Sequence, residues 1–292
     1  MFDLDLSEVE FSKWDRLFKI IIPKYLSPNL AYETGLHIGD GHLTIIKRKD
    51  NNARMFQIVF SGNFKEERGF YFNTISPLIF KLYNKIPHMR EDSKNSIRLY
   101  FYSQSIATFK NRVLGLPTGK KIGKIRIPKL IKDSSLEMRK NCLRGIIDTD
   151  FSLSFKKNGK YPTISANFPL ECKRLVNDIE EVLIELNIKP CISISNRKDD
   201  RYDPIKYYKD YKVDINGKDN LEKYVNTVGF KNPVHITKLL LWRRTGICNS
   251  YTSIKDRIGL LASMAQSGRA SAWYVNKKQK VVGSIPTRGS IN

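Results

Sequence analysis

The sequence contains no apolar run close to the roughly 18 to 20 residues that a membrane-spanning helix needs. Its first residues, MFDLDLSEVE, are mixed and acidic, whereas a secretory signal peptide is first basic and then apolar. These two absences argue against membrane-embedded and secreted proteins. The sequence therefore predicts an intracellular protein, in the cytoplasm, the nucleoid or the matrix of an organelle that encodes it.

Cysteine is scarce, and its spacing fits no zinc or redox motif. The four cysteines, Cys142, Cys172, Cys191 and Cys248, lie far apart, so there is no C-x-x-C pair. The segment LPTGKK does not have the G-x-x-x-x-G-K spacing of a phosphate-binding loop, and no glycine-rich dinucleotide loop is present. We expect reduced cysteine thiols in a core, and no nucleotide cofactor.

Positive charge is what the sequence has in excess. It contains 51 Lys and Arg residues against 29 Asp and Glu residues, a formal net charge of +22 at pH 7. With 292 residues, 41% of them hydrophobic, the chain is long and apolar enough to bury a core without disulfides. Such a charge favours a nucleic-acid partner bound through counterion release, although a generally basic protein is the alternative. Charge alone does not choose between DNA and RNA.

Two halves of the chain repeat the same order of predicted elements: a helix, a hairpin, a helix, strands and a helix. An amphipathic helix around 8–19 precedes the first half. For the first half, the patterns predict a helix at 28–38, strands at 42–49 and 54–63, a helix at 65–84, a strand at 96–103 and a helix at 105–114. For the second half, they predict a helix opened by a capping box at 134–137 and ending at 150, strands at 151–157 and 162–168, a helix at 170–187, strands at 190–196 and 206–215, and a helix at 219–228.

Short sequence echoes support a duplication. Both first hairpins end in similar tetrapeptides, SGNF at 61–64 and SANF at 165–168. The sequence thus predicts an N-terminal extension at 1–26, a first repeat at 27–130, a second repeat at 131–245 and a C-terminal extension at 246–292. Residues 265–292 have neither helical nor strand periodicity, which predicts a disordered tail.

The first helix of each repeat carries a glycine five residues before an aspartate, in ETGLHIGDG and LRGIIDTDF. Glycine inside a helix is unfavourable by about 1 kcal/mol relative to alanine, so close contact between the two helices is the expected reason for Gly35 and Gly145. Such packing would bring Asp40 and Asp150 together at helix ends, where the dipole disfavours a carboxylate. Divalent cations, above all Mg²⁺, relieve that repulsion. The alternative is that Asp40 is a turn residue and Asp150 a helix cap.

The segments GLHIGDG and LRGIIDTD resemble the two motif copies of LAGLIDADG homing endonucleases of the single-chain type. The resemblance covers roughly residues 27 to 245, and the flanks LGLPTGKK, KIRIPKLI and VGFKNPVHITKLL are similar to the family as well. It implies an α+β fold of two pseudo-symmetric αββαββα repeats, packed through the two motif helices. In each repeat a curved antiparallel sheet, backed by helices, would lie in the DNA major groove. The implied protein is an intron-encoded monomer that cuts both strands of a long, nearly unique site.

The same resemblance implies roles for residues around the motif aspartates. Asp40 and Asp150, with the preceding Gly39 and Thr149, would hold two or three Mg²⁺ ions, for which Mn²⁺ could substitute. Lys121 and His235 take the positions of the basic residues that follow each repeat, and His235 departs from the usual lysine. Asn63 and Asn167 would order water, although ordinary strand-end asparagines explain them equally well. Phe151 replaces the last motif glycine, which leaves the local turn geometry open.

Side chains of the first hairpin in each half are the expected readers of DNA bases. Strand alternation lets only about half of the candidates face the DNA. The candidates are Thr44, Lys47, Arg48, Arg54, Gln57, Val59, Ser154, Lys156, Lys157, Thr163 and Ser165. Of the histidines, we expect His37 in the core, His42 near backbone phosphate and His88 in a loop.

Three functions fit these observations, and the site-specific DNA endonuclease leads because both aspartates are present. An RNA maturase that assists splicing of its host intron would keep the fold and the charge. A DNA-binding regulator without catalysis would usually add a recognition module, and residues 236–262 are too few to indicate one.

Overall fold

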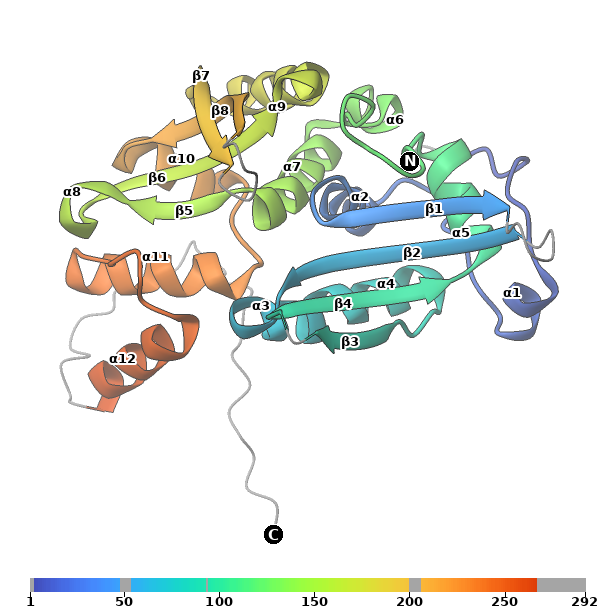
Figure 1. Ribbon diagram of the computed structural model, residues 1–292, viewed down its shortest axis with the longest axis horizontal. Helices are drawn as coiled ribbons and strands as arrows, with labels where there is room; N and C mark the ends of the chain where they lie inside the picture. The colour runs from blue at the N-terminus through green and yellow to red at the C-terminus, as the bar shows by residue number, and fades with distance from the viewer. Residues whose placement is uncertain (1–2, 48–53, 93, 200–205, 267–292) are drawn as a thin grey trace, which may run out of the picture.

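The computed structural model describes residues 3–47, 54–92, 94–199 and 206–266, which form two halves of the same architecture (Figure 1). Each half contains a four-stranded antiparallel sheet, with strand orders β1-β2-β4-β3 and β5-β6-β8-β7. The predicted α+β fold of two αββαββα repeats is confirmed. Arg48 and the predicted tail beyond Gln266 lie outside the described residues. Within the described ranges, no helix combines the length and the apolar character needed to cross a bilayer.

The N-terminal segment carries one short helix, α1 (Lys13–Leu17). The first repeat consists of α2 (Pro28–Gly39), β1 (Gly41–Lys47), β2 (Arg54–Asn63), α3 (Phe64–Phe70), the π-helical turn η1 (Tyr71–Ile75), α4 (Ser76–Tyr83), β3 (His88–Asp92), β4 (Ser96–Tyr102), α5 (Gln104–Thr108) and the π-helical turn η2 (Phe109–Val113). The second consists of α6 (Lys129–Lys132), α7 (Leu136–Asp150), β5 (Ser152–Phe155), α8 (Lys156–Gly159), β6 (Tyr161–Pro169), the 3₁₀ turn η3 (Leu170–Cys172), α9 (Lys173–Glu185), β7 (Pro190–Asp199), β8 (Lys206–Asn216) and α10 (Lys218–Thr227), followed by α11 (Pro233–Thr245) and α12 (Ile254–Gln266).

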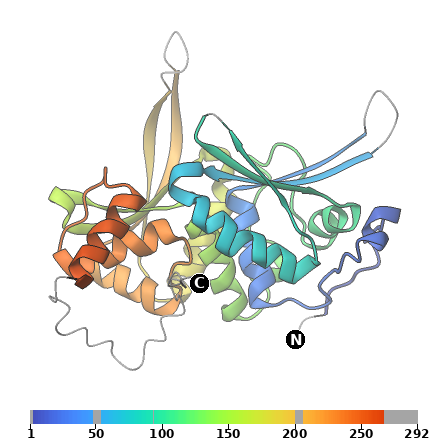
Figure 2. The same ribbon diagram turned by 90° about the horizontal axis from the view of Figure 1, so that it is seen from below.

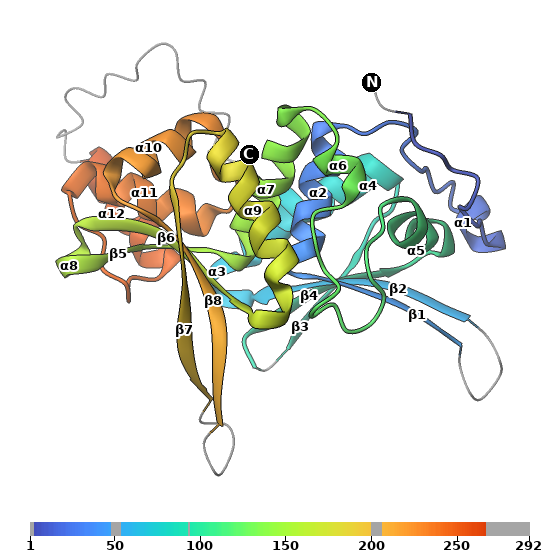
Figure 3. The same cartoon turned by 90° about the horizontal axis from the view of Figure 1, so that it is seen from above.

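Helices α2 and α7 lie side by side at the centre of the molecule, where the two repeats meet (Figure 3). Ser27 caps α2 by accepting a hydrogen bond from the Leu30 amide at 3.2 Å, and Pro28 occupies the first turn. A Cβ atom added at Gly35 would overlap the carbonyl of Cys142, and one added at Gly145 would overlap the carbonyl of Tyr32. The expected reason for both glycines, close contact between the helix backbones, is therefore confirmed.

Each sheet buries one face under helices and leaves the other open. In the first sheet Leu43, Ile58, Phe60, Leu99 and Phe101 are at most 1% exposed and face the core. Alternate residues of the same strands point away from the helices, because successive side chains of a strand face opposite sides. The long hairpins β1–β2 and β7–β8 extend away from the helical part of the molecule (Figure 2).

Several elements differ from the sequence-based expectations. The predicted amphipathic helix at 8–19 is reduced to the short helix α1, because Ser12 caps its start and Lys19, just after the C-cap Phe18, adopts a left-handed backbone conformation. Strand β3 was not expected, since HMRED has no apolar alternation; it is an edge strand with an exposed polar face, so His88 lies in a strand and the loop prediction is wrong. Lys156 and Lys157 lie in the helical turn α8 and not in a strand.

The capping box predicted at 134–137 does not form. Ser135 is the N-cap of α7 without a side-chain hydrogen bond. The Ser134 hydroxyl instead donates to the carbonyl of Ile131 at 2.6 Å, and Glu137 accepts a hydrogen bond from Asn141 at 2.8 Å. The preceding helix α6 ends at Lys132, so its last carbonyls compete for the serine.

The C-terminal helices α11 and α12 pack on both repeats. Trp242 of α11 stacks on Phe155 with ring centroids 5.3 Å apart. Arg257 of α12 is only 1% exposed, and its guanidinium donates to the Thr237 hydroxyl at 3.0 Å and to the Glu66 carboxylate of α3 at 3.2 Å. Because a buried arginine needs such partners, α12 is fixed against α3 of the first repeat.

Replacing Gly35 with alanine tests the helix contact. The new methyl group meets backbone atoms of α7, which cannot rotate away as a flexible side chain can. We expect Gly35→Ala to lower the free energy of unfolding by about 3 kcal/mol or more. Gly259→Ala in α12 is the control, because no atom lies within 4 Å of its added Cβ; we expect it to be neutral or slightly stabilising. Urea unfolding measures both, and equal stabilities of the two variants would contradict the contact.

Candidate active site and nucleic-acid face

The two motif aspartates meet where α2 and α7 end. Asp40 is the C-cap of α2, and Asp150 is the last residue of α7. A Cβ atom added at Gly39 would lie 3.3 Å from the carboxyl carbon of Asp150 and would overlap the side chain of Thr149. The glycine-lined contact thus continues to the ends of both helices and brings the four predicted metal-site residues together.

The pKa values of both carboxyl groups are raised. Burial raises the pKa of Asp40 well above its ordinary value, and the nearby Glu67 and Asp150 carboxylates raise it further. The Tyr71 hydroxyl donates a hydrogen bond to Asp40 Oδ2 at 3.1 Å, which opposes this shift. Burial also raises the pKa of Asp150, to about 6, and the nearby Lys121 opposes that rise. Negative charge at this site is therefore incompletely compensated.

Lys121 holds the end of α2. Its ammonium donates to the carbonyl oxygens of Ile38 at 2.8 Å, Gly41 at 3.2 Å and Gly39. The last carbonyls of a helix have no partner within the helix, and their dipole attracts a cation. Burial lowers the pKa of Lys121, whereas Asp150 and Asp40 raise it. The structure thus places Lys121 beside both aspartates.

Asn232, and not His235, is the counterpart of Lys121 in the second half. The Asn232 amide donates to the carbonyl of Asp148 at 2.8 Å, as Lys121 donates to the carbonyl of Ile38. Ile38 and Asp148 each lie two residues before a motif aspartate. The sequence does not indicate this role, because Asn232 before Pro233 has the pattern of an ordinary helix cap, and it does cap α11 by accepting a hydrogen bond from the Val234 amide at 2.9 Å.

The structure contradicts the predicted role of His235 as a basic residue. Its side chain is only 4% exposed, and neither ring nitrogen contacts a carboxylate among the described residues. It packs on Phe230 with ring centroids 5.0 Å apart, and burial lowers its pKa to about 3. At neutral pH it is an uncharged core residue. His37 is also buried, as expected.

The two asparagines differ in their surroundings. Asn63 caps α3 by accepting a hydrogen bond from the Glu66 amide at 3.0 Å, and it accepts another from Asn95 at 3.2 Å. These bonds give Asn63 the ordinary role of a strand-end and capping residue. Asn167 lies exposed on the open face of the second sheet, opposite Lys212; its role in ordering water stays a prediction.

Sequence reasoning missed Glu67 and Tyr71, which lie four residues apart across α3 and η1. Glu67 accepts hydrogen bonds from the Asn63 amide at 2.8 Å and from the Asn232 side chain at 3.0 Å. It therefore joins the first repeat to the residue that holds the end of α7. The i, i+4 spacing places Glu67 and Tyr71 on one helical face, but nothing in the sequence indicates that Asp40 faces them.

The donor set fits Mg²⁺. No group of three or more His, Cys, Asp and Glu residues in the described ranges could hold a metal, so any site rests on the two carboxylates. Within those ranges no hydrogen bond reaches the Asp150 carboxylate, and Lys121 bonds to carbonyl groups rather than to either aspartate. Mg²⁺ commonly binds one or two carboxylates and completes its shell with water and phosphate oxygens. The Gly39 carbonyl, a predicted metal ligand, accepts a hydrogen bond from Lys121.

The open face of the first sheet follows from strand register, because residues directly opposite each other share a face. Thr44 pairs with Gln57, which pairs with Tyr102, and Val59 pairs with Tyr100. The predicted base-contacting residues Thr44, Gln57 and Val59 therefore all lie on the open face, opposite to the face of Leu43 and Ile58. The face also includes His42, which was expected near backbone phosphate, and the unpredicted residues Ser61, His88, Arg90, Arg98, Tyr100 and Tyr102.

Lys47 and Arg54 pair with each other on the opposite face, in line with Leu43 and Ile58. Arg54 also lies 3.8 Å from Glu10 of the N-terminal segment. Their prediction as base readers is therefore wrong, because strand alternation turns both away from the open face.

The open face of the second sheet carries acidic residues that are already paired. Asp210 lies 2.7 Å from Arg197, and Asp214 lies 3.1 Å from Lys212. The predicted residues Ser154 and Ser165 lie on this face. Thr163 lies there too, but it is 3% exposed and donates to Asn216 at 3.0 Å. Arg197 and Lys212 are thus already compensated by carboxylates of the same face.

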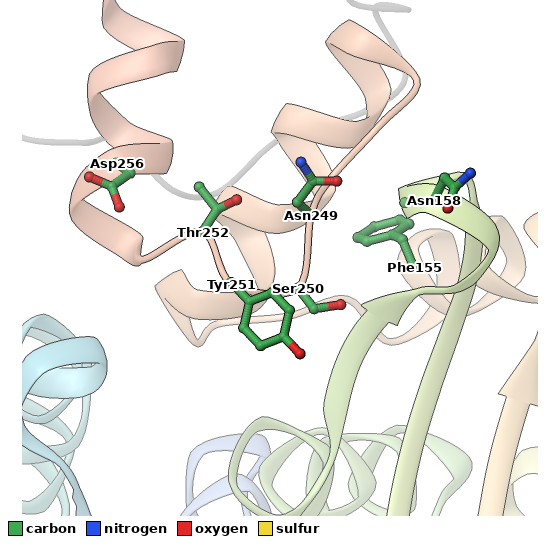
Figure 4. A pocket seen from close by; sticks show the side chains of 8 residues that line it. Phe155, Asn158, Asn249, Ser250, Tyr251, Thr252 and Asp256 are labelled. Carbon is green, nitrogen blue, oxygen red and sulfur yellow. The ribbon is translucent and has the colours of Figure 1, made fainter.

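A pocket of about 540 Å³ lies between the β5–β6 turn and the α11–α12 connection (Figure 4). Its lining includes Phe155, Asn158, Tyr251 and Asp256, and neither motif aspartate. It is therefore separate from the candidate active site.

No family model and no curated protein matches this sequence. Among solved structures, mesophilic variants of the homing endonuclease I-DmoI are 18% identical with a TM-score of 0.48, over 70% of this chain and 90% of theirs. The homing endonuclease I-WcaI bound to its DNA recognition sequence is 16% identical with a TM-score of 0.47, over 77% and 92% of the two chains. I-SmaMI bound to uncleaved DNA with calcium ions is 11% identical with a TM-score of 0.42, over 84% and 99%. At such low identity and superposition, function must be argued from this chain's own residues.

The buried His235 predicts a specific loss of stability in acid. Its pKa falls from 6.5 to about 3 on folding, so the neutral folded form is fully favoured above pH 6.5. As pH drops from 6.5 towards 3, the unfolded chain takes up a proton that the folded chain refuses, at a cost on the order of 4 kcal/mol. We expect His235→Leu to lose less stability than the unmodified protein over this range. Urea midpoints against pH measure the difference, and parallel curves would refute it.

Proposed function

We propose that the chain is a site-specific DNA endonuclease of the LAGLIDADG homing type, which makes a double-strand break in a Mg²⁺-dependent reaction. The observation that carries the proposal is the meeting of Asp40 and Asp150 at the ends of two glycine-packed helices. A carboxylate from each repeat gives one site that can serve the two strands of a duplex. The pseudo-symmetric halves then match the approximate two-fold symmetry of the DNA backbone.

Charge on the open sheet faces supports duplex DNA as the substrate. Arg90 and Arg98 lie directly opposite each other across β3 and β4, and no described carboxylate pairs with either. Like charges in that position are destabilising, so the arrangement suits a bound polyanion. The DNA major groove, about 12 Å wide, admits a two-stranded ribbon such as β1–β2.

Phosphodiester hydrolysis needs a water molecule in line with the leaving oxygen and neutralisation of the developing charge. Asp40 and Asp150 would hold the divalent ions, with the Gly39 and Thr149 carbonyls as further ligands. When bound, such ions stabilise charge on the phosphate and on the leaving oxygen. The chain itself supplies position: Tyr71 orients the Asp40 carboxylate, Lys121 fixes the end of α2, and Asn232 fixes the end of α7.

The two alternative functions are less well supported. An RNA maturase or a non-catalytic regulator does not need two converging carboxylates. The α11–α12 pair is no typical helix-turn-helix, because eight residues from Gly246 to Ser253 separate the helices, where that motif uses about three or four. Arg257 also fixes α12 against α3.

Removing either motif carboxylate tests the proposal. We expect Asp40→Asn and Asp150→Asn each to abolish double-strand cleavage, while duplex binding stays within about tenfold, because an amide keeps the shape but holds divalent ions poorly. Cleavage is measured in Mg²⁺ on a plasmid that carries the fused sequences flanking the gene, and EDTA should stop it.

Asp256→Asn is the matched control, because Asp256 is an exposed carboxylate at the start of α12, remote in sequence from both motifs. It should cleave as the unmodified protein does. Full cleavage by either motif variant would refute the assignment of the aspartates.

Arg98→Ala tests the nucleic-acid face. We expect weaker duplex binding. We also expect the slope of log K against log salt concentration to become less steep by about one unit, because one phosphate contact is lost. Arg174→Ala, on the exposed side of α9, is the control and should change neither quantity. Fluorescence anisotropy over a series of salt concentrations gives both slopes. Identical slopes for the two variants would mean that the open face of the first sheet does not contact phosphate.

A further inference from the structure

The helix α1 is inverted: its acidic residue is buried and its apolar residues are exposed. Asp15 is 3% exposed, whereas Trp14, Leu17 and Phe18 are 66%, 64% and 56% exposed. Exposed large apolar side chains are ordinary when they are isolated, but a cluster marks an interaction site.

The orientation of α1 is fixed by hydrogen bonds. The Asp15 carboxylate accepts from the Ser103 hydroxyl at 2.7 Å, the Ser105 amide at 3.1 Å and the Ser12 amide at 2.9 Å. Ser12 and Asp15 also form a capping box. These bonds join α1 to the corner between β4 and α5, so the aromatic side chains are held outward rather than exposed by fraying.

A pocket of about 530 Å³ lies between α1 and the ends of β2 and β4. Trp14, Phe18, Phe56 and Tyr102 supply its aromatic lining, and Arg54 and Lys85 supply positive charge. Trp14 and Phe18 stack with ring centroids 6.0 Å apart and an interplanar angle of 19°, and the Lys85 ammonium lies 5.4 Å from the centre of the Phe18 ring. Flat rings beside cations are the chemistry that binds a nucleobase and its phosphate.

The charge around this pocket is complementary to nucleic acid. Lys13, Arg16 and Lys19 flank the exposed rings in the sequence. Of the nearby acidic groups, Asp15 is buried in its hydrogen bonds, and Glu10 lies 2.7 Å from Arg112 and 3.8 Å from Arg54. Lys85 is therefore the cation of this pocket that has no described carboxylate within ion-pair distance. The surrounding positive charge therefore favours a polyanion as the partner over a protein surface that is apolar or has few acidic residues.

We propose that this pocket binds an unpaired base of an RNA strand, with the base stacked on Trp14 and its phosphate beside Lys85. Bases of a DNA duplex are paired and stacked, so they cannot enter a pocket without being extruded, whereas RNA loops present splayed bases regularly. The site is remote from Asp40 and Asp150 in the fold: α1 lies at the outer end of the first sheet, away from the central helices (Figures 1 and 3). It goes beyond the proposed endonuclease function and does not depend on it.

The test compares full-length variants for binding to a short single-stranded RNA of mixed sequence, by fluorescence anisotropy at fixed salt. We expect Trp14→Ala to weaken RNA binding at least about fivefold, since stacking on one aromatic side chain contributes about 1–3 kcal/mol per base. Tyr251→Ala is the matched control, because Tyr251 is a fully exposed aromatic residue outside this pocket. Duplex DNA binding should be unchanged in both variants.

Lys85→Gln keeps the aromatic residues and the anchoring of α1, so it should weaken RNA binding even if Trp14→Ala disturbs the fold. Equal RNA affinity of the Lys85 variant, the Trp14 variant and the control would overturn the proposal. Equal binding of single-stranded DNA would overturn the assignment to RNA. Self-association of the unmodified protein that Trp14→Ala abolishes, measured by sedimentation, would identify the apolar face as a dimer contact instead. Duplex cleavage, assayed separately, reports on the endonuclease proposal alone.

Discussion

The backbone contact between α2 and α7 is the constraint on which the rest of the molecule depends. Gly35 and Gly145 allow the two helices to approach until a carbonyl of one lies where the other would carry a Cβ atom. This approach joins two repeats that have separate sheets, and it brings the C-terminal ends of the two helices together. The relative positions of the two sheets and of the two carboxylates therefore depend on this helix contact.

Two carboxylates at adjacent helix ends repel each other, and the residues around them compensate this repulsion differently in the two halves. In the first half, Lys121 binds the last carbonyls of α2, and Tyr71 binds Asp40. In the second half the neutral Asn232 takes the place of the lysine. The two halves therefore have the same backbone arrangement at the helix ends, but only the first has a cationic side chain there. The fully buried Lys110 and Glu33 form an ion pair, whereas among the described residues neither motif aspartate has an ion-pair partner.

The open faces of the two sheets are also unequal. The first presents Arg90 and Arg98 without described partners, whereas the second neutralises Asp210 and Asp214 internally with Arg197 and Lys212. Phosphate attraction should thus be stronger on the first half, and the second should depend more on hydrogen bonds from its hydroxyl-bearing side chains. The aromatic pocket beside α1 lies at the outer end of the first sheet.

The sequence by itself determined the repeated order of elements, the two central strands of each sheet and the meeting of Asp40 with Asp150, because glycine spacing and strand alternation are local patterns that can be read along the chain. It did not determine that Asn232 replaces His235, that Lys47 and Arg54 face away from the open side, or that Glu67 and Tyr71 stand beside Asp40. Those facts depend on which helix turn faces inward and on strand register. Both are decided by contacts between residues far apart in the chain, so only the tertiary structure could decide them.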